Sequence, residues 1–186
     1  MTVIPTPLTG AFVIELDPRR DDRGYFVRTY CQDEFAKHEL ATNFVQSSQS
    51  RTIGKGSIRG MHFQQPPHLE VKLVRCLRGA MLDVFVDLRN GSPTFLHWFA
   101  VELSESNYRM AYLPAGLAHG FQTLTDEVDV LYDITPAYVL GAEGRIRFDD
   151  PLLGIRWPWP ISNVSAKDAN AKFIECGFQG LGEPGA

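Results

Sequence analysis

Four side chains in the middle of the chain are of the types that move a proton beside a carbonyl group. His62 and Lys72 lie ten residues apart, His119 lies in the run at 114–121, and Tyr132 follows. A histidine is a suitable base, a tyrosine can act as the acid, and a lysine stabilises negative charge on an oxygen. These residue types predict proton transfer next to a carbonyl without a cofactor.

The elements that must position these side chains are predicted to be short β-strands. Between residues 12 and 135, short apolar or alternating runs are separated by Gly, Pro, Asn and Asp. A helical period occurs at few places, 33–40 and 166–173 among them. We therefore predict an all-β fold, a sandwich or jelly roll with a few short helices, including one near the C-terminus. The predicted strands include 71–77, 80–88, 95–103, 108–114 and 128–134.

Length and composition favour one domain. The chain has 186 residues, a length that fits a single domain over 1–186 with 163–186 as a C-terminal arm. Its net charge is −4. The charge does not favour binding to nucleic acid or to anionic membranes. The chain has no apolar run of about 20 residues and no signal-peptide pattern, so we expect a cytoplasmic protein. Three widely spaced cysteines argue against a disulfide framework or a zinc site.

The dipeptide Arg78-Gly79 predicts a hairpin turn, because glycine adopts a positive φ without strain. In that register the flanking strands pair with each other, Lys72 opposite Phe85, and Lys72 and Asp83 share one face. A charged pair on an otherwise apolar face indicates a candidate site. A solvated Lys72 on an edge strand is the alternative, and the hairpin alone favours neither.

Strict alternation divides the side chains around His62 between two faces. The even-numbered residues from 58 to 64 point one way, and Arg59, Met61 and Phe63 point the other way. A bulge at Gly60 would change this assignment.

The spacing P-x-G-x-x-H at 114–119 resembles the second box of the cupin superfamily, whose first box supplies a metal site through H-x-H and a later Glu. The first box here reads His62-Phe63-Gln64, with Glu70 late. Glutamine is a poor ligand for the metals that imidazole sites hold. No metal site is therefore predicted.

Further segments in order along the chain resemble one enzyme family. They are DRGYF at 22–26, RGMHFQ at 59–64, KLVR at 72–75, DVFVDLR at 83–89, GSPT at 91–94, the run at 114–121, Tyr132, Tyr138, DDP at 149–151, WP at 157–158 and SAKD at 165–168. The chain is thereby similar to the dTDP-4-dehydrorhamnose 3,5-epimerase family of nucleotide-sugar epimerases. The resemblance covers most of the sequence.

The resemblance implies a cupin jelly roll that forms a homodimer by exchanging N-terminal strands. It also implies no metal or organic cofactor. The implied substrate is a nucleoside-diphosphate 4-keto-6-deoxy sugar, whose keto group acidifies the hydrogens on C3 and C5. A base removes one of them, an enolate forms, and an acid returns a proton to the opposite face.

The same resemblance assigns roles to individual residues. His62 resembles the base, Asp168 the group that orients it, Tyr132 the acid on the other sugar face, and Lys72 the group that stabilises the enolate oxygen. Arg59 and Lys167 suit the charge of a diphosphate. The full set of expected ligand-binding positions is Arg23, Arg28, Gln46, Ser48, Arg59, Gln64, Asp83, His119, Tyr138, Glu143 and Lys167.

Taken singly, these residues have plainer interpretations. Tyr132 could be a strand aromatic with its hydroxyl at the surface, Asp168 could cap a helix, and Arg23 could be a solvated loop charge. Their occurrence in the order of the family favours the functional interpretation.

The chain departs from the family pattern at two ligand-binding positions. Arg28 replaces a glutamate, and Ser48 replaces the second amide of a Q-x-N motif that begins at Gln46. A carboxylate accepts the N3–H of thymine or uracil, whereas an arginine only donates. Arg28 therefore favours a base with an acceptor at that edge, cytosine or guanine. A surface Arg28 that does not touch the ligand is the alternative.

The residues leave three other functions open. They are a nucleotide-sugar ketoisomerase with the same enolate chemistry, a metal-dependent cupin oxygenase and a non-catalytic sugar-binding cupin. The complete set of His62, Lys72, Tyr132 and Asp168 argues against the last. Inversion at C3, at C5 and at both positions is equally compatible with the sequence.

Overall fold

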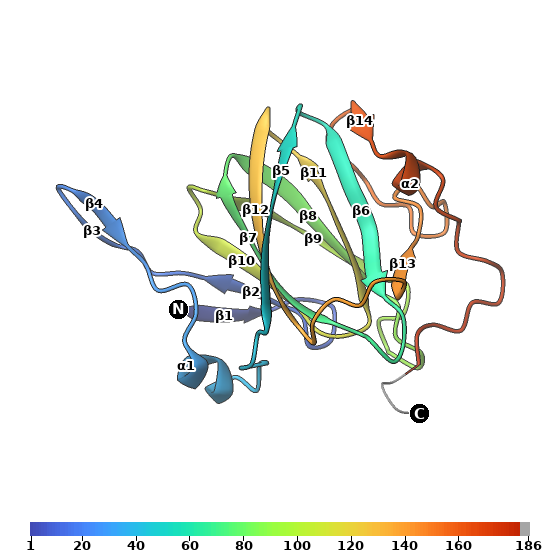
Figure 1. Cartoon of the computed structure of the whole chain (residues 1–186), viewed down its shortest axis with the longest axis horizontal. Helices are drawn as coiled ribbons and strands as arrows, with labels where there is room; N and C mark the ends of the chain where they lie inside the picture. The colour runs from blue at the N-terminus through green and yellow to red at the C-terminus, as the bar shows by residue number, and fades with distance from the viewer. Residues whose placement is uncertain (183–186) are drawn as a thin grey trace.

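A computed structural model describes residues 1–182 of the chain, and over these residues it forms fourteen strands and two short helices (Figure 1). The alternating runs of the sequence form strands, and the clusters of turn residues connect them. The long strands make two large sheets. The first sheet has the strand order β1 (Thr2–Pro5), β2 (Phe12–Glu15), β10 (Arg109–Leu113), β7 (Val71–Arg78), β12 (Glu127–Thr135) and β5 (Gln46–Ile53).

The second sheet faces the first. Its order is β13 (Glu143–Arg145), β6 (Ser57–Gln64), β11 (Leu117–Thr123), β8 (Ala80–Asp87) and β9 (Trp98–Ser104), and β14 (Asn163–Val164) pairs with β6 in parallel. The predicted all-β fold with two sheets is confirmed. The strands predicted from alternation are all present, and their ends differ by one to three residues at most.

The main core lies between the two sheets. Val74, Cys76 and Val130 come from the first sheet and meet Phe85 and Phe121 from the second, all of them fully or almost fully buried. A second apolar cluster covers the outer face of the second sheet, and a third covers the outer face of the first sheet together with helix α1 (Gln32–Lys37).

The predicted hairpin at Arg78-Gly79 is wrong as a strand pairing. β7 pairs with β10 and β12, whereas β8 pairs with β9 and β11, so the turn carries the chain across the core from one sheet to the other. Gly79 has φ +72°, and a Cβ there would lie 2.2 Å from the Glu127 carbonyl oxygen. The turn chemistry was identified correctly, but it does not decide whether two apolar strand faces pack side by side or face to face.

Lys72 and Asp83 do not share one face as predicted, because β7 and β8 lie in different sheets, but their side chains point into the same space between the sheets. Lys72, Val74 and Cys76 point into the space between the sheets from one side, and Asp83 and Phe85 point into it from the other. Residues from both strands can therefore contribute to one site.

Both helices are shorter than predicted. α1 ends at Lys37, and Glu39 has φ 58°, a left-handed conformation that does not continue a helix. α2 (Ala166–Ala169) begins after Ser165, whose Oγ accepts a hydrogen bond from the Asp168 N–H at 3.1 Å. Neither helix of the described residues is long and apolar enough to cross a membrane.

The predicted C-terminal arm returns to the second sheet. β14 and α2 lie along β6, and Ile174, Phe178 and Leu181 pack into the cluster on the outer face. Residues 183–186 of the arm lie outside the described residues.

A hairpin of β3 (Arg19–Asp21) and β4 (Gly24–Phe26) projects away from the sheets (Figure 1). Its two aromatic side chains, Tyr25 and Phe26, are 51% and 71% exposed. Exposed aromatic side chains on a projecting hairpin are typical of a surface that contacts another molecule.

Candidate active site

A cavity of about 290 Å³ opens between the two sheets, and most of the predicted site residues line it. Strands of both sheets contribute, because alternate side chains of each strand point into the space between them. The predicted residues that line it are Gln46, Ser48, His62, Gln64, Lys72, Tyr132, Tyr138 and Glu143.

His62 of β6 is paired with Asp168 of α2. The distance from His62 Nε2 to Asp168 Oδ1 is 2.7 Å, and the Asp168 carboxyl is 5% exposed while the imidazole is open to the cavity. The C-terminal arm makes this contact possible, because β14 runs beside β6 and delivers α2 to the histidine. The plainer interpretation of Asp168 as a helix cap is wrong, since Ser165 caps α2.

The charge of Asp168 fixes the tautomer of His62. Burial disfavours the charged carboxylate, but the hydrogen bond and charge of His62, with hydrogen bonds from Ser165 and the Gly60 N–H, hold the pKa of Asp168 below its ordinary value. An ionised carboxylate only accepts, so His62 Nε2 carries the proton that it donates. His62 Nδ1 is then left with a lone pair that can accept a proton.

Tyr132 of β12 reaches the same cavity from the opposite sheet. Its hydroxyl shares a hydrogen bond of 3.3 Å with Ser50 Oγ of β5. Burial raises the pKa of Tyr132 well above its ordinary value, and the nearby Asp83 charge adds to this. The phenol is therefore protonated at neutral pH and is able to donate.

Lys72 of β7 stands next to Tyr132 in the first sheet and is held by a carboxylate. Its Nζ lies 2.6 Å from Glu70 Oε1, and both side chains are about nine-tenths buried. A buried cation with one carboxylate partner and an opening to the cavity can stabilise an oxyanion there. The alternative of a solvated lysine on an edge strand is wrong, because β7 lies between β10 and β12.

His119 and Asp83 form a second buried pair behind the cavity. His119 Nε2 lies 2.6 Å from Asp83 Oδ1. The His119 and Tyr132 rings pack edge-on, with 6.0 Å between their centroids. The two residues do not line the cavity but support Tyr132 from behind, and their contact with a ligand stays a prediction.

Arg59, Lys167 and Asp168 line an adjoining cavity of about 270 Å³. Strict alternation assigned Arg59 to the face opposite His62, and this prediction is wrong. The pairing of β6 with β11 shifts register at Gly60, which has φ 134° and whose added Cβ would lie 2.5 Å from Gly120 Cα. The bulge brings Arg59 round to the side of His62, where its Nε donates to Thr52 Oγ1 at 2.7 Å.

The polar rim of the first cavity is a linked set of amides and a carboxylate. The Gln46 and Gln64 side-chain oxygens accept hydrogen bonds from the backbone N–H groups of Tyr138 and Val139, both at 3.2 Å. The Tyr138 hydroxyl donates to Glu143. Gln64 lines the cavity, and its Nε2 is buried with no hydrogen-bond partner among the described residues.

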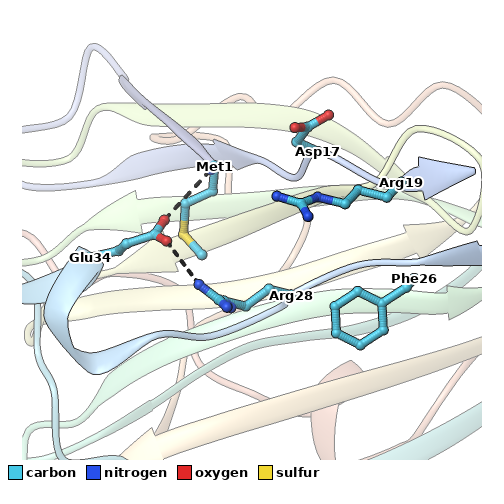
Figure 2. A pocket seen from close by; sticks show the side chains of 6 residues that line it. All are labelled: Met1, Asp17, Arg19, Phe26, Arg28 and Glu34. Atoms are coloured by element: carbon cyan, nitrogen blue, oxygen red, sulfur yellow. Dashed lines mark hydrogen bonds and ion pairs between the residues drawn. The ribbon is translucent and has the colours of Figure 1, made fainter.

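Arg23 and Arg28 lie away from both cavities within the protomer. Arg23 is on the projecting hairpin, paired with Asp21 at 2.6 Å. Arg28 lies in a shallow pocket beside Phe26, and Figure 2 shows its guanidinium directed at Glu34, 3.5 Å away. The structure thus gathers the predicted site residues into one region except for these two and the His119–Asp83 pair.

Three residues of this region were missed from the sequence. Glu70 holds Lys72, Ser50 holds the Tyr132 hydroxyl, and Arg145 lines both cavities. Ser50 could have been found from alternation, since it lies two and four residues from Ser48 and Gln46 on β5. Glu70 directly precedes β7 and lies two residues from Lys72. Arg145 could have been found in the same way, since it lies two residues after the assigned Glu143 on the three-residue strand β13.

No three His, Cys, Asp or Glu side chains of residues 1–182 are placed to hold a metal ion. Glu70, the late carboxylate of the cupin-like box, binds Lys72.

Comparison with known proteins finds one family over most of the chain. The profile of the dTDP-4-dehydrorhamnose 3,5-epimerase family matches residues 5–175. The dTDP-4-dehydrorhamnose 3,5-epimerase of Methanothermobacter thermautotrophicus is 41% identical over 172 residues, which cover 91% of this chain and 92% of that protein.

Solved structures of the family superpose closely. The enzyme of Bacillus anthracis, solved with TDP and PPi bound, gives a TM-score of 0.90 at 36% identity and covers 93% of this chain and 99% of its own. The enzyme of Legionella pneumophila, in complex with dTDP-4-keto-L-rhamnose, gives 0.88 at 37% identity and covers 92% of each chain. The predicted jelly roll of the cupin type is confirmed, and the chain belongs to the dTDP-4-dehydrorhamnose 3,5-epimerase family of isomerases.

Proposed function

We propose that the chain is a cofactor-independent epimerase that inverts C3, C5 or both in a nucleoside-diphosphate 4-keto-6-deoxy sugar. The observation that carries the proposal is the position of His62 and Tyr132, which reach one cavity from opposite sheets. A sugar ring between them would present one face to a base and the other face to an acid. Family membership favours this function over the ketoisomerase, the oxygenase and the sugar-binding protein.

The reaction uses groups that are already in the protonation states it needs. His62 Nδ1 takes the hydrogen from a carbon next to the ketone as a proton, and the electron pair moves to the keto oxygen. Asp168 stabilises the imidazolium that forms, and Lys72 stabilises the enolate oxygen. The electron pair then returns to carbon, which takes the Tyr132 proton on the opposite face. Solvent restores the proton on Tyr132 and removes the one on His62.

The test is incubation of the protein in D₂O with a nucleotide-linked 4-keto-6-deoxyhexose, followed by NMR. The proposal expects deuterium at C3, at C5 or at both, together with inversion at those centres. Movement of the ketone to another carbon would instead identify a ketoisomerase, and binding without any exchange would identify a sugar-binding protein.

A homodimer would complete the site. We propose that the β3–β4 hairpin, with exposed Tyr25 and Phe26, reaches the partner subunit and brings Arg23 to the partner's nucleotide. Sedimentation of the purified chain should give twice the mass of one chain, and Phe26→Asp should shift it toward a monomer. A wild-type chain that is monomeric at micromolar concentration would contradict the dimer.

Arg28 is expected to set the preference for the base. Its contact with Glu34 is an exposed ion pair, worth little, so its donors remain available for a ligand. We expect CDP or GDP to bind about ten- to a hundredfold more tightly than dTDP, and Arg28→Glu to shift the preference toward dTDP. Calorimetry with the three diphosphates measures this, and Arg156→Glu, on an exposed arginine, controls for the change in net charge. Tighter binding of dTDP by the wild type would refute the role of Arg28 and leave the epimerase proposal intact.

A further inference from the structure

Arg145 is a partly buried cation at the edge of the second sheet, with 31% of its side chain exposed. It is the last residue of β13, and it pairs in register with His62 of β6, so the two side chains point to the same side. Gly144 beside it must be a glycine, because a Cβ there would lie 2.2 Å from the Phe63 ring, and this close approach keeps β13 flat against β6. Arg145 Nε is buried and has no partner among the described residues.

The nearest anion does not satisfy this side chain. Arg145 Nε lies 3.7 Å from Asp168 Oδ1, which is beyond hydrogen-bond distance. That oxygen already accepts the 2.7 Å hydrogen bond from His62. The rest of the side chain is partly exposed and lines both cavities, so the other N–H donors of the guanidinium can reach an acceptor on a ligand.

Arg145 stands where the two cavities meet. Of residues 1–182, only Arg145 and His62 line both of them. The cavity lined by Tyr132 and Lys72 would hold the sugar. The other cavity is lined by three cations, Arg59, Arg145 and Lys167, and by one anion, Asp168, so its net charge is +2. The diphosphate of a nucleotide sugar carries one negative charge on each of its two phosphates, so the charges match.

We propose that Arg145 binds the phosphate that carries the sugar and so fixes the reach of the sugar toward His62. This inference rests on the proposed function and names one contact within it. A sugar in one cavity would be linked to a diphosphate in the other at the boundary where Arg145 and His62 line both cavities. His62 is already bound to Asp168, whereas the guanidinium is partly exposed and its fork of N–H donors suits two phosphate oxygens.

The test compares binding of ligands with one and with two phosphates. The variants are Arg145→Gln and, as the matched control, Arg147→Gln, which removes an arginine bonded to Asp149 outside both cavities. The probes are dTDP, CDP and GDP with the corresponding monophosphates, measured by calorimetry. We expect Arg145→Gln to weaken the tightest diphosphate about ten- to a hundredfold and its monophosphate less than about threefold. Arg145→Lys should recover part of the loss, and Arg147→Gln should change neither.

Kinetics separate this contact from a purely structural role. We expect Arg145→Gln to raise KM for the nucleotide sugar by a factor similar to the loss in diphosphate affinity, with a smaller change in kcat. Unchanged diphosphate affinity, equal loss for the monophosphate, or a fall in kcat with KM unchanged would overturn the inference, the last by showing that Arg145 acts through Asp168. If the wild type binds diphosphates through Arg145 but exchanges no sugar proton, the proposed function fails and this contact stands.

Discussion

His62→Asn is expected to abolish exchange of the sugar protons with solvent while the protein stays folded. The variant keeps a polar side chain next to Asp168 but removes the Nδ1 lone pair that takes the proton. Removal of a general base costs about 10²–10⁴-fold in rate. The measurement is deuterium incorporation next to the ketone in D₂O, with thermal unfolding of both proteins recorded in the same buffer.

The control for this variant is His97→Asn, on an exposed histidine that lines neither cavity. It should exchange at the wild-type rate. Near-normal exchange by His62→Asn would show that a group other than His62 is the base.

The strand that carries Lys72 could be predicted because it has a clear period of two. Lys72, Val74 and Cys76 alternate with residues of the opposite face, and the structure keeps them on one face of β7. The partner of each strand could not be predicted in this way. β7 and β8 have apolar faces that suit a hairpin as well as two opposed sheets, and only the packing of the whole core distinguishes these arrangements.

The side of β6 on which Arg59 lies depends on a contact that is distant in sequence. Gly60 approaches Gly120 of β11 so closely that the strand bulges, and the bulge moves Arg59 to the side of His62. Alternation gives no sign of such a contact, although a glycine within a strand indicates where one can occur. Arg145 was missed although Glu143, two residues earlier on β13, was assigned to the site, because a three-residue strand shows no period of its own and takes its direction from β6.

Arg23 and Arg28 could not be placed in the site from a single chain. Their assignment came from the resemblance, and the protomer places them on and beside a projecting hairpin, away from His62. The dimer is the simplest way to bring them to a nucleotide, so the sedimentation experiment also tests whether these two residues belong to the site.

Tyr132→Phe is expected to separate proton removal from inversion. The variant keeps the ring that packs against His119 but loses the hydroxyl bound to Ser50. His62, Asp168 and Lys72 are untouched, so the enolate should still form and take a solvent deuteron back from the His62 side. Exchange should therefore persist, while net inversion falls by about 10²–10⁴-fold, the usual cost of losing a general acid.

The two outcomes are read from one NMR experiment, because deuterium with retained configuration reports removal and deuterium with inverted configuration reports delivery by the opposite face. Tyr112→Phe is the matched control. Tyr112 is also a buried strand tyrosine, but it packs on the outer face of the first sheet, where its hydroxyl accepts the Ala41 N–H at 3.0 Å. That variant should lose about 1 kcal/mol of stability and no inversion. Full inversion by Tyr132→Phe would mean that another group, reaching the cavity from the first sheet or from a partner subunit, donates the proton.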